Sequence, residues 1–267
     1  MQELVQEKIS DFHTKLFSWY KENKKNYPWR KTTDPYHIMV SEFMLQQTQT
    51  ARVVPKYLAF IDKFPTLESL ANSENREILE LWSGLGYNRR AIWLKEAAQN
   101  ILSLGTFPKN HIELKKIKGI GNYTSRAIII FAFNADVATV DTNIRRIFIH
   151  EGFATEETKE KELFDIAQQL LPKNRSSEYH SALMDYGNTI LTSAKTKIKP
   201  KTTQSKFKGS TRQYRGLIIK YLTIHHAASK SEIIKECSIP EEKADEIFSK
   251  LEKDRLLIKE KENYSII

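Results

Sequence analysis

The sequence has very little cysteine. Cys237 is the only one among 267 residues, and one thiol can form neither an intrachain disulfide nor a four-thiolate metal site. It lies in an apolar helical stretch, so we expect it to pack in a core. We therefore expect no four-thiolate metal site, and we assign no metal and no cofactor to this chain.

The sequence also lacks long hydrophobic runs. The longest, around Ala127–Phe133, is far shorter than the roughly 20 residues that span a bilayer. The N-terminus, MQELVQEKIS, does not have the basic start and apolar core of a signal peptide. We therefore expect a cytoplasmic protein with no membrane partner.

Acidic residues are outnumbered by basic ones. Lys and Arg total 42 against 33 Asp and Glu, a net charge of +9. This balance favours a polyanionic partner, because each phosphate that a protein neutralises releases condensed counterions.

Proline and glycine are sparse, and most apolar residues recur at helical spacing, so the sequence predicts a mainly all-α protein. The helices are expected at 2–23, 35–48, 50–62, 76–81, 88–103, 111–116, 122–133, 141–149, 159–170 and 177–192.

The segment Lys195–Lys208 is predicted to be an exposed basic linker, because it has six lysines, one proline and no acidic residue. Beyond it, helices are expected at 212–224 and 230–237. Ser238 is expected to N-cap a third helix with Pro240 in its first turn, and a hairpin is expected around 261–263.

This order is typical of a small winged-helix (α+β) module. With 11 basic and 10 acidic residues from Arg212 onward, the module is nearly neutral. It is therefore interpreted either as a DNA reader or as a surface that docks a protein partner.

The stretch LKKIKGIGNYTSRAI at 114–128 predicts a helix-hairpin-helix. Gly119 and Gly121 allow a tight turn and a close approach to a phosphate, and the amides that open the second helix favour an anion. Lys115, Lys116 and Lys118 add positive charge at the same turn.

Five further motifs are spread along the sequence: YPWR at 27–30, SEFMLQQTQT at 41–50, GLGY at 84–87, KGIGNYTSRAI at 118–128 and VDTNIRRI at 140–147. Together they resemble those of the MutY family of mismatch adenine glycosylases. The resemblance covers about residues 8–192 and follows the family's order.

The resemblance implies the helix-hairpin-helix glycosylase fold, with two α-domains and an active site in the cleft between them. It also implies flipping of the target base, which cannot be reached inside a stacked duplex. The expected domains are 1–28 with 135–194, 29–134 with the helix-hairpin-helix at 111–131, the linker 195–211, and the module 212–267.

Glu42 is the expected general acid. At helical spacing its neighbours are Ile38, Met39 and Leu45, and apolar surroundings should raise the pKa of a carboxyl group toward the useful range. The resemblance implies that Glu42 protonates the base, at N7 of adenine.

Asp141 begins a D-T-N sequence that suits a helix N-cap. The resemblance implies that it also stabilises the cationic sugar or forms a transient adduct with it, as paired carboxylates do in glycosidic cleavage. It further implies that Tyr123 and Asn143 hydrogen-bond around this centre.

Tyr123 also bears on the type of reaction. The related endonuclease III group has a lysine here that forms a Schiff base and cuts the strand, whereas a tyrosine cannot. The resemblance therefore implies base removal without strong lyase activity.

The resemblance implies further DNA-contacting residues. Gln47 and Tyr87 would insert into the duplex, Tyr87 beside the opposing base, and Trp29, Arg30 and Asp185 would line or support the adenine pocket. The complete expected set is Trp29, Arg30, Gln46, Gln47, Thr48, Tyr87, Lys118, Gly119, Gly121 and Asp185.

The sequence departs from the family twice. Leu191 stands where the first cysteine of the family's iron–sulfur cluster would be, so we expect no cluster and expect Lys195–Lys208 to replace the loop that it shapes. The module after residue 212 occupies the place of a Nudix-like domain that recognises 8-oxoguanine.

The sequence therefore predicts a monofunctional DNA glycosylase for base excision repair, monomeric and nucleoid-associated, acting on double-stranded DNA. The expected substrate is adenine opposite guanine or 8-oxoguanine. Removal of thymine from G·T mismatches, or of a modified base, stays open. So does a non-catalytic DNA-binding regulator, although Glu42, Asp141, Tyr123 and Asn143 together argue against it.

Overall fold

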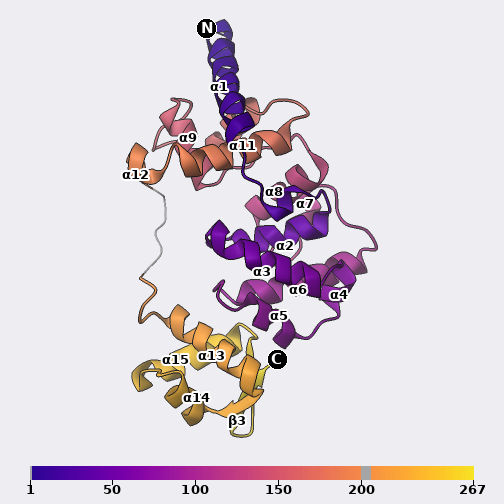
Figure 1. The fold of residues 1–267 in the computed structure, drawn as a ribbon, viewed down its shortest axis with the longest axis vertical. Helices are drawn as coiled ribbons and strands as arrows, with labels where there is room; N and C mark the ends of the chain where they lie inside the picture. Colours follow the sequence, from indigo (N-terminus) through magenta and orange to yellow (C-terminus); the bar gives the residue numbers. More distant parts are fainter. Residues whose placement is uncertain (1, 200–205) are drawn as a thin grey trace. The chain divides into compact units, whose positions relative to one another are not determined.

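The computed structural model of the protein describes residues 2–199 and 206–267, so part of the predicted linker, 200–205, lies outside the described residues. The chain is mostly helical, as predicted, with a small sheet near its C-terminus (Figure 1). No helix in the described ranges is long and apolar enough to cross a membrane.

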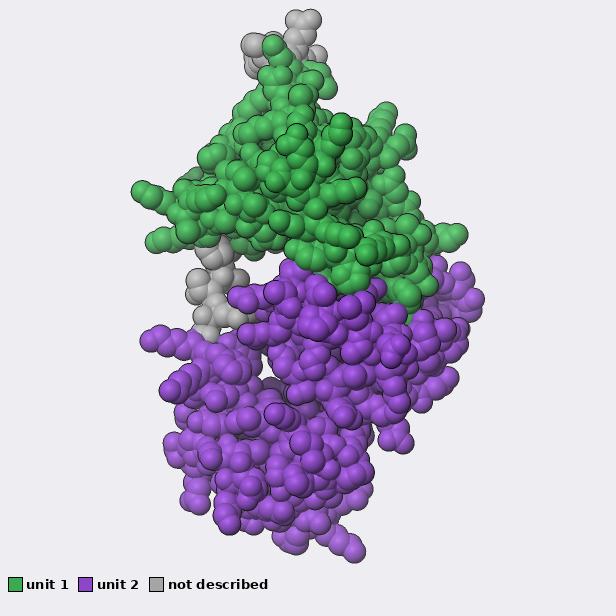
Figure 2. Space-filling view, in the orientation of Figure 1, with its two compact units in different colours: residues 1–38, 109–116, 120–203 green, residues 39–108, 117–119, 204–267 purple. Residues whose placement is uncertain are grey.

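The chain divides into two compact units, coloured separately in Figure 2. Unit 1 comprises Met1–Ile38, Lys109–Lys116 and Ile120–Thr203, and unit 2 comprises Met39–Pro108, Ile117–Gly119 and Gln204–Ile267. The predicted domain boundaries do not coincide with these units and stay a prediction.

Unit 1 is built around the helix pairs α1·α11 and α9·α11. Its core includes Phe12, Leu16, Phe148 and Tyr179, all at most 4% exposed. Its helices are α1 (Gln2–Asn23), the 3-10 helix η1 (Pro28–Arg30), the start of α2 (Pro35–Leu45), α7 (His111–Leu114), α8 (Asn122–Phe133), α9 (Thr142–His150), α10 (Glu160–Gln169), α11 (Ser176–Thr189) and α12 (Ser193–Thr196).

The first part of unit 2 is a group of helices around buried aromatic side chains. Phe60 and Trp82 are fully buried, with their rings in edge contact at 6.2 Å. The helices are the rest of α2, α3 (Thr50–Lys63), α4 (Leu67–Ala71), α5 (Asn75–Trp82) and α6 (Arg89–Ser103); α4 and α5 both pack on α6.

The C-terminal module completes unit 2. It consists of α13 (Thr211–His225), β1 (Ala227–Ser229), α14 (Lys230–Glu236), α15 (Glu241–Lys253), β2 (Leu257–Glu260) and β3 (Asn263–Ile266). The antiparallel sheet has the order β1-β3-β2. The predicted hairpin is the pair β2–β3. Three elements were not predicted because they have only three to five residues each, too few to show a periodic pattern: β1, α4 and α12.

Three local predictions were wrong. The helix predicted to 192 ends at Thr189. The helix predicted to 48 ends at Leu45, where the amide of Thr48 turns back to the Leu45 carbonyl. Ser238 does not N-cap α15; Pro240 does. Ser238 has φ +48° and lies just past the end of α14, where the amide of Ile239 reaches the carbonyl of Ile234, an arrangement that terminates helices.

Cys237 is buried, 7% exposed, as predicted. Burial raises the pKa of its thiol to about 11, so the side chain is an uncharged part of the module's core.

Candidate active site

Asp141 is the N-cap of α9, as its sequence predicted. Its Oδ1 accepts a hydrogen bond from the amide of Ile144 at 2.7 Å, and its Oδ2 accepts one from Asn143 Nδ2 at 3.3 Å. The carboxylate is thus oriented by a backbone donor at the positive end of a helix and by a side-chain donor.

A buried arginine fixes Asn143. Nη2 of Arg146 donates to Asn143 Oδ1 at 2.6 Å and to the carbonyl of Gly187 at 2.9 Å. A Cβ at Gly187 would lie 2.8 Å from that of Asn143, so this glycine lets α11 approach α9. Sequence reasoning missed Arg146 and Gly187, although Arg146 lies within the VDTNIRRI motif.

The electrostatic setting of Asp141 has two opposing parts. Burial raises the pKa of its carboxyl above the ordinary value, while the donors from Ile144 and Asn143 and the charge of Arg146 oppose that rise. Burial has the larger effect, so the pKa of this carboxyl stays above its ordinary value, and the three opposing groups favour the ionised form that could attract a developing cation.

Glu42 is buried on α2, with 5% of the residue exposed, and the adjacent Phe43 and Met44 are fully buried. Of its neighbours at helical spacing, Ile38 and Met39 are buried as well, 2% and 0% exposed, and the role of Glu42 as general acid stays a prediction. Glu42 belongs to unit 2, whereas Asp141 belongs to unit 1.

Arg90, which sequence reasoning did not select, joins two loops of unit 2. Its Nη1 donates to the carbonyls of Phe43, Met44 and Gln46 at 2.6, 3.1 and 2.7 Å. Its Nη2 donates to Thr48 Oγ1 and to the carbonyls of the GLGY loop, Leu85 and Gly86, at 3.1, 3.3 and 3.0 Å.

This arrangement, which we name the Arg90 cluster, comprises Arg90 and its acceptors on residues 43–48 and 85–86. Burial lowers the pKa of Arg90 to about 10, so its guanidinium remains charged at neutral pH. Thr48, predicted to contact DNA, takes part in the cluster and also donates to the Leu85 carbonyl at 3.3 Å. The predicted Gln46 contributes its carbonyl.

Each of the two joined loops carries a non-glycine residue in the left-handed region. Gln47 has φ +54° and Tyr87 has φ +49°, and both side chains are exposed. Such conformations are unfavourable for these residues and persist only where the surrounding structure imposes them. The Arg90 cluster supplies that constraint.

Arg30 and Asp185 form a two-pronged ion pair in unit 1. Nη1 and Nη2 of Arg30 lie 2.6 and 2.9 Å from the two carboxylate oxygens, and the amide of Lys25 also donates to Asp185 at 3.0 Å. The guanidinium lies over the ring of Tyr27, which stacks on Trp29. The structure therefore brings Trp29, Arg30 and Asp185 together.

The helix-hairpin-helix residues differ among themselves. Gly119 has φ +90°, and a Cβ there would lie 2.6 Å from that of Trp93, so its missing side chain makes room for Trp93 as well as for the turn. Gly121 is the N-cap of α8. Lys118 pairs with Glu96 at 3.0 Å on the surface, an exposed pair that contributes little to stability.

Tyr123 lies in the first turn of α8 and is partly buried. Its phenol has no amine, so this side chain cannot form a Schiff base with a sugar.

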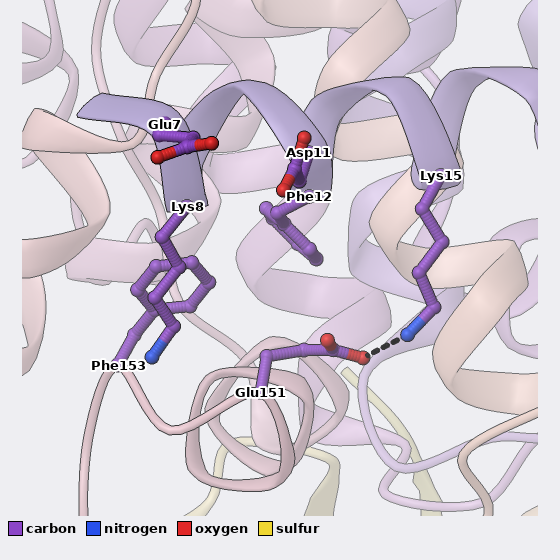
Figure 3. Close-up of a pocket in the computed structure, with 7 residues that line it drawn as sticks. All are labelled: Glu7, Lys8, Asp11, Phe12, Lys15, Glu151 and Phe153. Atoms are coloured by element: carbon purple, nitrogen blue, oxygen red, sulfur yellow. Dashed lines mark hydrogen bonds and ion pairs between the residues drawn. The ribbon is translucent and has the colours of Figure 1, made fainter. Parts of the chain in front are cut away.

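A pocket of about 320 Å³ lies elsewhere in unit 1 and contains none of the predicted site residues (Figure 3). Both of its lysines have partners: Lys15 pairs with Glu151 at 2.8 Å, and Lys8 donates to the Gly152 carbonyl at 2.9 Å. The pocket is lined by Glu7, Lys8, Asp11, Phe12, Lys15, Glu151 and Phe153.

The residues do not fit an iron–sulfur cluster. Leu191 is an apolar core residue, 6% exposed, and Cys237 is the chain's one thiol, whereas such clusters are held mostly by cysteine thiolates. Within the described ranges, no three His, Cys, Asp or Glu side chains are grouped so that they could hold a metal ion.

Comparison with known proteins agrees with this architecture. The chain is 38% identical over 182 residues to the adenine DNA glycosylase of Mycolicibacterium smegmatis, covering 66% of this chain and 62% of the relative. It is 34% identical over 228 residues to that of Buchnera aphidicola, covering 84% and 63%. The chain thus spans less than two thirds of these relatives.

Solved structures give the same fold. A thermostable thymine-DNA glycosylase matches with TM-score 0.65 and 27% identity, covering 74% of this chain and 92% of its own. A trapped endonuclease III–DNA covalent intermediate matches with TM-score 0.62 and 16% identity, covering 76% and 91%, which speaks to the fold alone. Residues 40–173 match the model of the HhH-GPD superfamily base excision DNA repair proteins. The chain belongs to this family.

Proposed function

We propose that this protein is a DNA glycosylase that hydrolyses the N-glycosidic bond of a mismatched adenine, opposite guanine or 8-oxoguanine, in double-stranded DNA. The oriented carboxylate of Asp141 carries the proposal of glycosidic chemistry. The identity to adenine DNA glycosylases supports adenine as the base.

In this mechanism the two carboxylates act in opposite protonation states. Glu42, buried in apolar surroundings, donates a proton to N7 of the adenine, so that the base leaves as a neutral group. Asp141 remains ionised and stabilises the positive charge that develops on the sugar. Water then adds to the sugar and gives its proton to Glu42, which has become a carboxylate, so that the hydrolysis is complete and the general acid is restored. Asn143 orients Asp141, and Tyr123 adds a hydrogen-bonding group at the same centre.

We propose that the enzyme is monofunctional and does not use an iron–sulfur cluster. Tyr123 cannot form the Schiff base that a lyase needs. One cysteine is too few to hold a cluster. We therefore propose that side chains and backbone amides bind and orient the DNA without one. Gln46, Gln47 and Tyr87 lie on the two loops joined by Arg90, and Lys118, Gly119 and Gly121 belong to the hairpin proposed to bind phosphate.

The C-terminal module is proposed to be a winged helix. Its element order, with a first strand between α13 and α14 and a β2–β3 hairpin after α15, supports this assignment. We propose that the protein acts as a monomer.

Thymine or a modified base is the second candidate substrate. The specific observation in its favour is the match to a thymine-DNA glycosylase at 27% identity over 74% of this chain. The QQTQ sequence at 46–49, which resembles that of the adenine glycosylases, favours adenine.

A panel of duplexes tests the proposal. The protein is incubated under single-turnover conditions with A·G, A·8-oxoguanine, T·G and matched A·T duplexes, and base loss is read after alkali cleavage of the abasic strand. Excision of adenine from the first two only is the expected result. Excision from T·G alone would establish thymine as the substrate. Binding without excision from any of these duplexes would refute both mismatch activities and leave a modified-base glycosylase or a non-catalytic regulator.

A further inference from the structure

A pocket in unit 1 lies between α1 and the turn that follows α9 (Figure 3). Its volume of about 320 Å³ is in the range of pockets that hold small ligands, roughly 300–1,000 Å³. The turn contributes Glu151 and Phe153, and α1 contributes the other lining residues. None of the lining residues takes part in the proposed mechanism, so the pocket lies outside the machinery of base removal.

Two lysines of α1 join the walls of the pocket. Lys8 donates from Nζ to the carbonyl of Gly152 at 2.9 Å, and Lys15 pairs with Glu151 at 2.8 Å. The two lysines lie two helical turns apart, so the turn is attached to α1 at two separate points. The shape of the pocket is therefore set before any ligand binds.

Two phenylalanine rings provide the apolar part of the pocket. Phe12 is 4% exposed, and its ring is in edge contact with that of Phe153, with 5.3 Å between the centroids. The Lys8 ammonium lies over the Phe153 ring, 4.6 Å from its centroid, so this ring accepts a cation at close range. The same rings offer surface to the aliphatic stem of a second cationic side chain.

Glu7 and Asp11 give the pocket unbalanced negative charge. They lie one helical turn apart on α1, and both are exposed. Neither has a hydrogen bond or an ion pair with another described residue, whereas both lysines of the pocket have partners. Like charges at this spacing repel each other, and a cation bound between them would remove that repulsion. The pocket therefore favours a cation and disfavours a phosphate of DNA.

We propose that this pocket binds an arginine side chain of a partner protein, with its guanidinium between Glu7 and Asp11. The aliphatic stem packs on the two phenylalanine rings. A guanidinium is planar and has several N–H donors, so it can bind two carboxylates at once, whereas an ammonium is a compact point charge. Docking at this pocket is independent of which base the enzyme removes.

Binding of short peptides to the full chain tests this assignment. The probes are three capped pentapeptides, identical except for a central arginine, lysine or citrulline, together with free spermidine. Dissociation constants come from the NMR shifts of the backbone amides of Gly152 and Phe153 during titration at low salt. The variants are Glu7→Gln, Asp11→Asn and Phe153→Leu, and the matched control is Glu22→Gln, which changes an exposed acid elsewhere on α1.

Wild type and Glu22→Gln should bind the arginine peptide with a dissociation constant of about 1 mM, the affinity of a few charge-assisted hydrogen bonds. They should bind the other probes at least about tenfold more weakly. Glu7→Gln and Asp11→Asn should each weaken binding of the arginine peptide about tenfold, because each removes a charged acceptor. Phe153→Leu should weaken it about threefold, because the ring is lost and the apolar surface is kept.

Thermal midpoints of Glu7→Gln and Asp11→Asn near that of wild type would show that the fold is intact. No shift in wild type with the arginine peptide, equal affinity for the citrulline peptide, or unchanged affinity in both carboxylate variants would overturn the site. Equal affinity for the lysine peptide or for spermidine would overturn arginine recognition and leave a general cation site. These outcomes do not require excision, so they are separate from those of the mismatch panel.

Discussion

The Asp141 site in unit 1 and the Arg90 cluster in unit 2 are opposite in charge: hydrogen-bond donors surround an acid in the first, and acceptors surround a base in the second. Around Asp141, donors from Ile144 and Asn143 converge on one carboxylate. Around Arg90, carbonyls from two loops converge on one guanidinium. The first arrangement sets the electrostatics of a single reacting group, whereas the second sets the shape of two loops that carry exposed side chains.

The difference also concerns distance along the chain. The Asp141 site is local, within residues 141–146 apart from its contact with α11, whereas Arg90 joins residues more than 40 positions apart. Loss of the first should therefore affect chemistry with little effect on stability, and loss of the second should affect stability and DNA binding together.

Asp141→Asn is expected to give the largest effect on chemistry. An asparagine still N-caps α9, but it cannot stabilise a cationic sugar, so single-turnover excision should fall about 100- to 1,000-fold. Because burial raises the pKa of this carboxyl, the ionised form costs stability at neutral pH. The variant should therefore unfold at an equal or higher temperature, and a clear fall in the thermal midpoint would contradict this.

Arg90→Met should be the most destabilising change. It leaves buried carbonyls without a donor and should lower the free energy of unfolding by about 3 kcal/mol, measured by denaturant titration. Affinity for an abasic-analogue duplex should fall as well, because Gln47 and Tyr87 lose the constraint on their backbones. Arg255→Met, which removes an exposed arginine of the same unit, is the control. Wild-type stability in Arg90→Met would show that the cluster is dispensable.

The same contrast explains what the sequence could predict. The Asp141 cap and the α8 boundaries were accessible because capping residues and apolar periodicity are local signals, whereas the contact of Asn143 with Asp141 was implied by the family resemblance. Arg90 was not, because its acceptors are carbonyls of distant residues that no side-chain pattern marks. The close contacts of Gly119 with Trp93 and of Gly187 with Asn143 were not predictable either, because they depend on how distant helices pack. The assigned roles of Glu42, Tyr123 and the DNA-contacting residues stay predictions.

His180 should make the unit 1 site sensitive to acid. Its ring accepts from the amide of Thr139 at 3.1 Å and contacts the Ser176 carbonyl at 2.8 Å, and burial lowers its pKa to about 4. The unfolded chain takes up this proton near pH 6.5, so stability is complete above that pH and falls toward pH 4, by about 3 kcal/mol.

His180→Gln should retain both hydrogen bonds without the titration. Denaturant midpoints measured across this pH range should then fall less steeply than those of wild type, and parallel curves would exclude His180 as the cause. His150→Gln, an exposed histidine in the same unit, is the matched control.

Asn143→Ala should produce the smallest effect, a shift in pH dependence. The Asn143 amide stabilises the ionised form of Asp141 and lowers its pKa. Without it the pKa rises, so the acidic limb of the excision rate should move to higher pH, while the rate at high pH changes less. A profile that only scales down at every pH would mean that Asn143 does not act through Asp141.

Glu42→Gln tests the central claim most directly, that two carboxylates divide the work of base removal. The amide keeps the shape of the buried side chain but cannot donate the proton to the leaving base. Single-turnover excision from the best mismatch should fall by at least about 100-fold, while affinity for the same duplex and the thermal midpoint stay near those of wild type and of Glu68→Gln, an exposed change in the same unit. Excision within about tenfold of wild type would contradict the account.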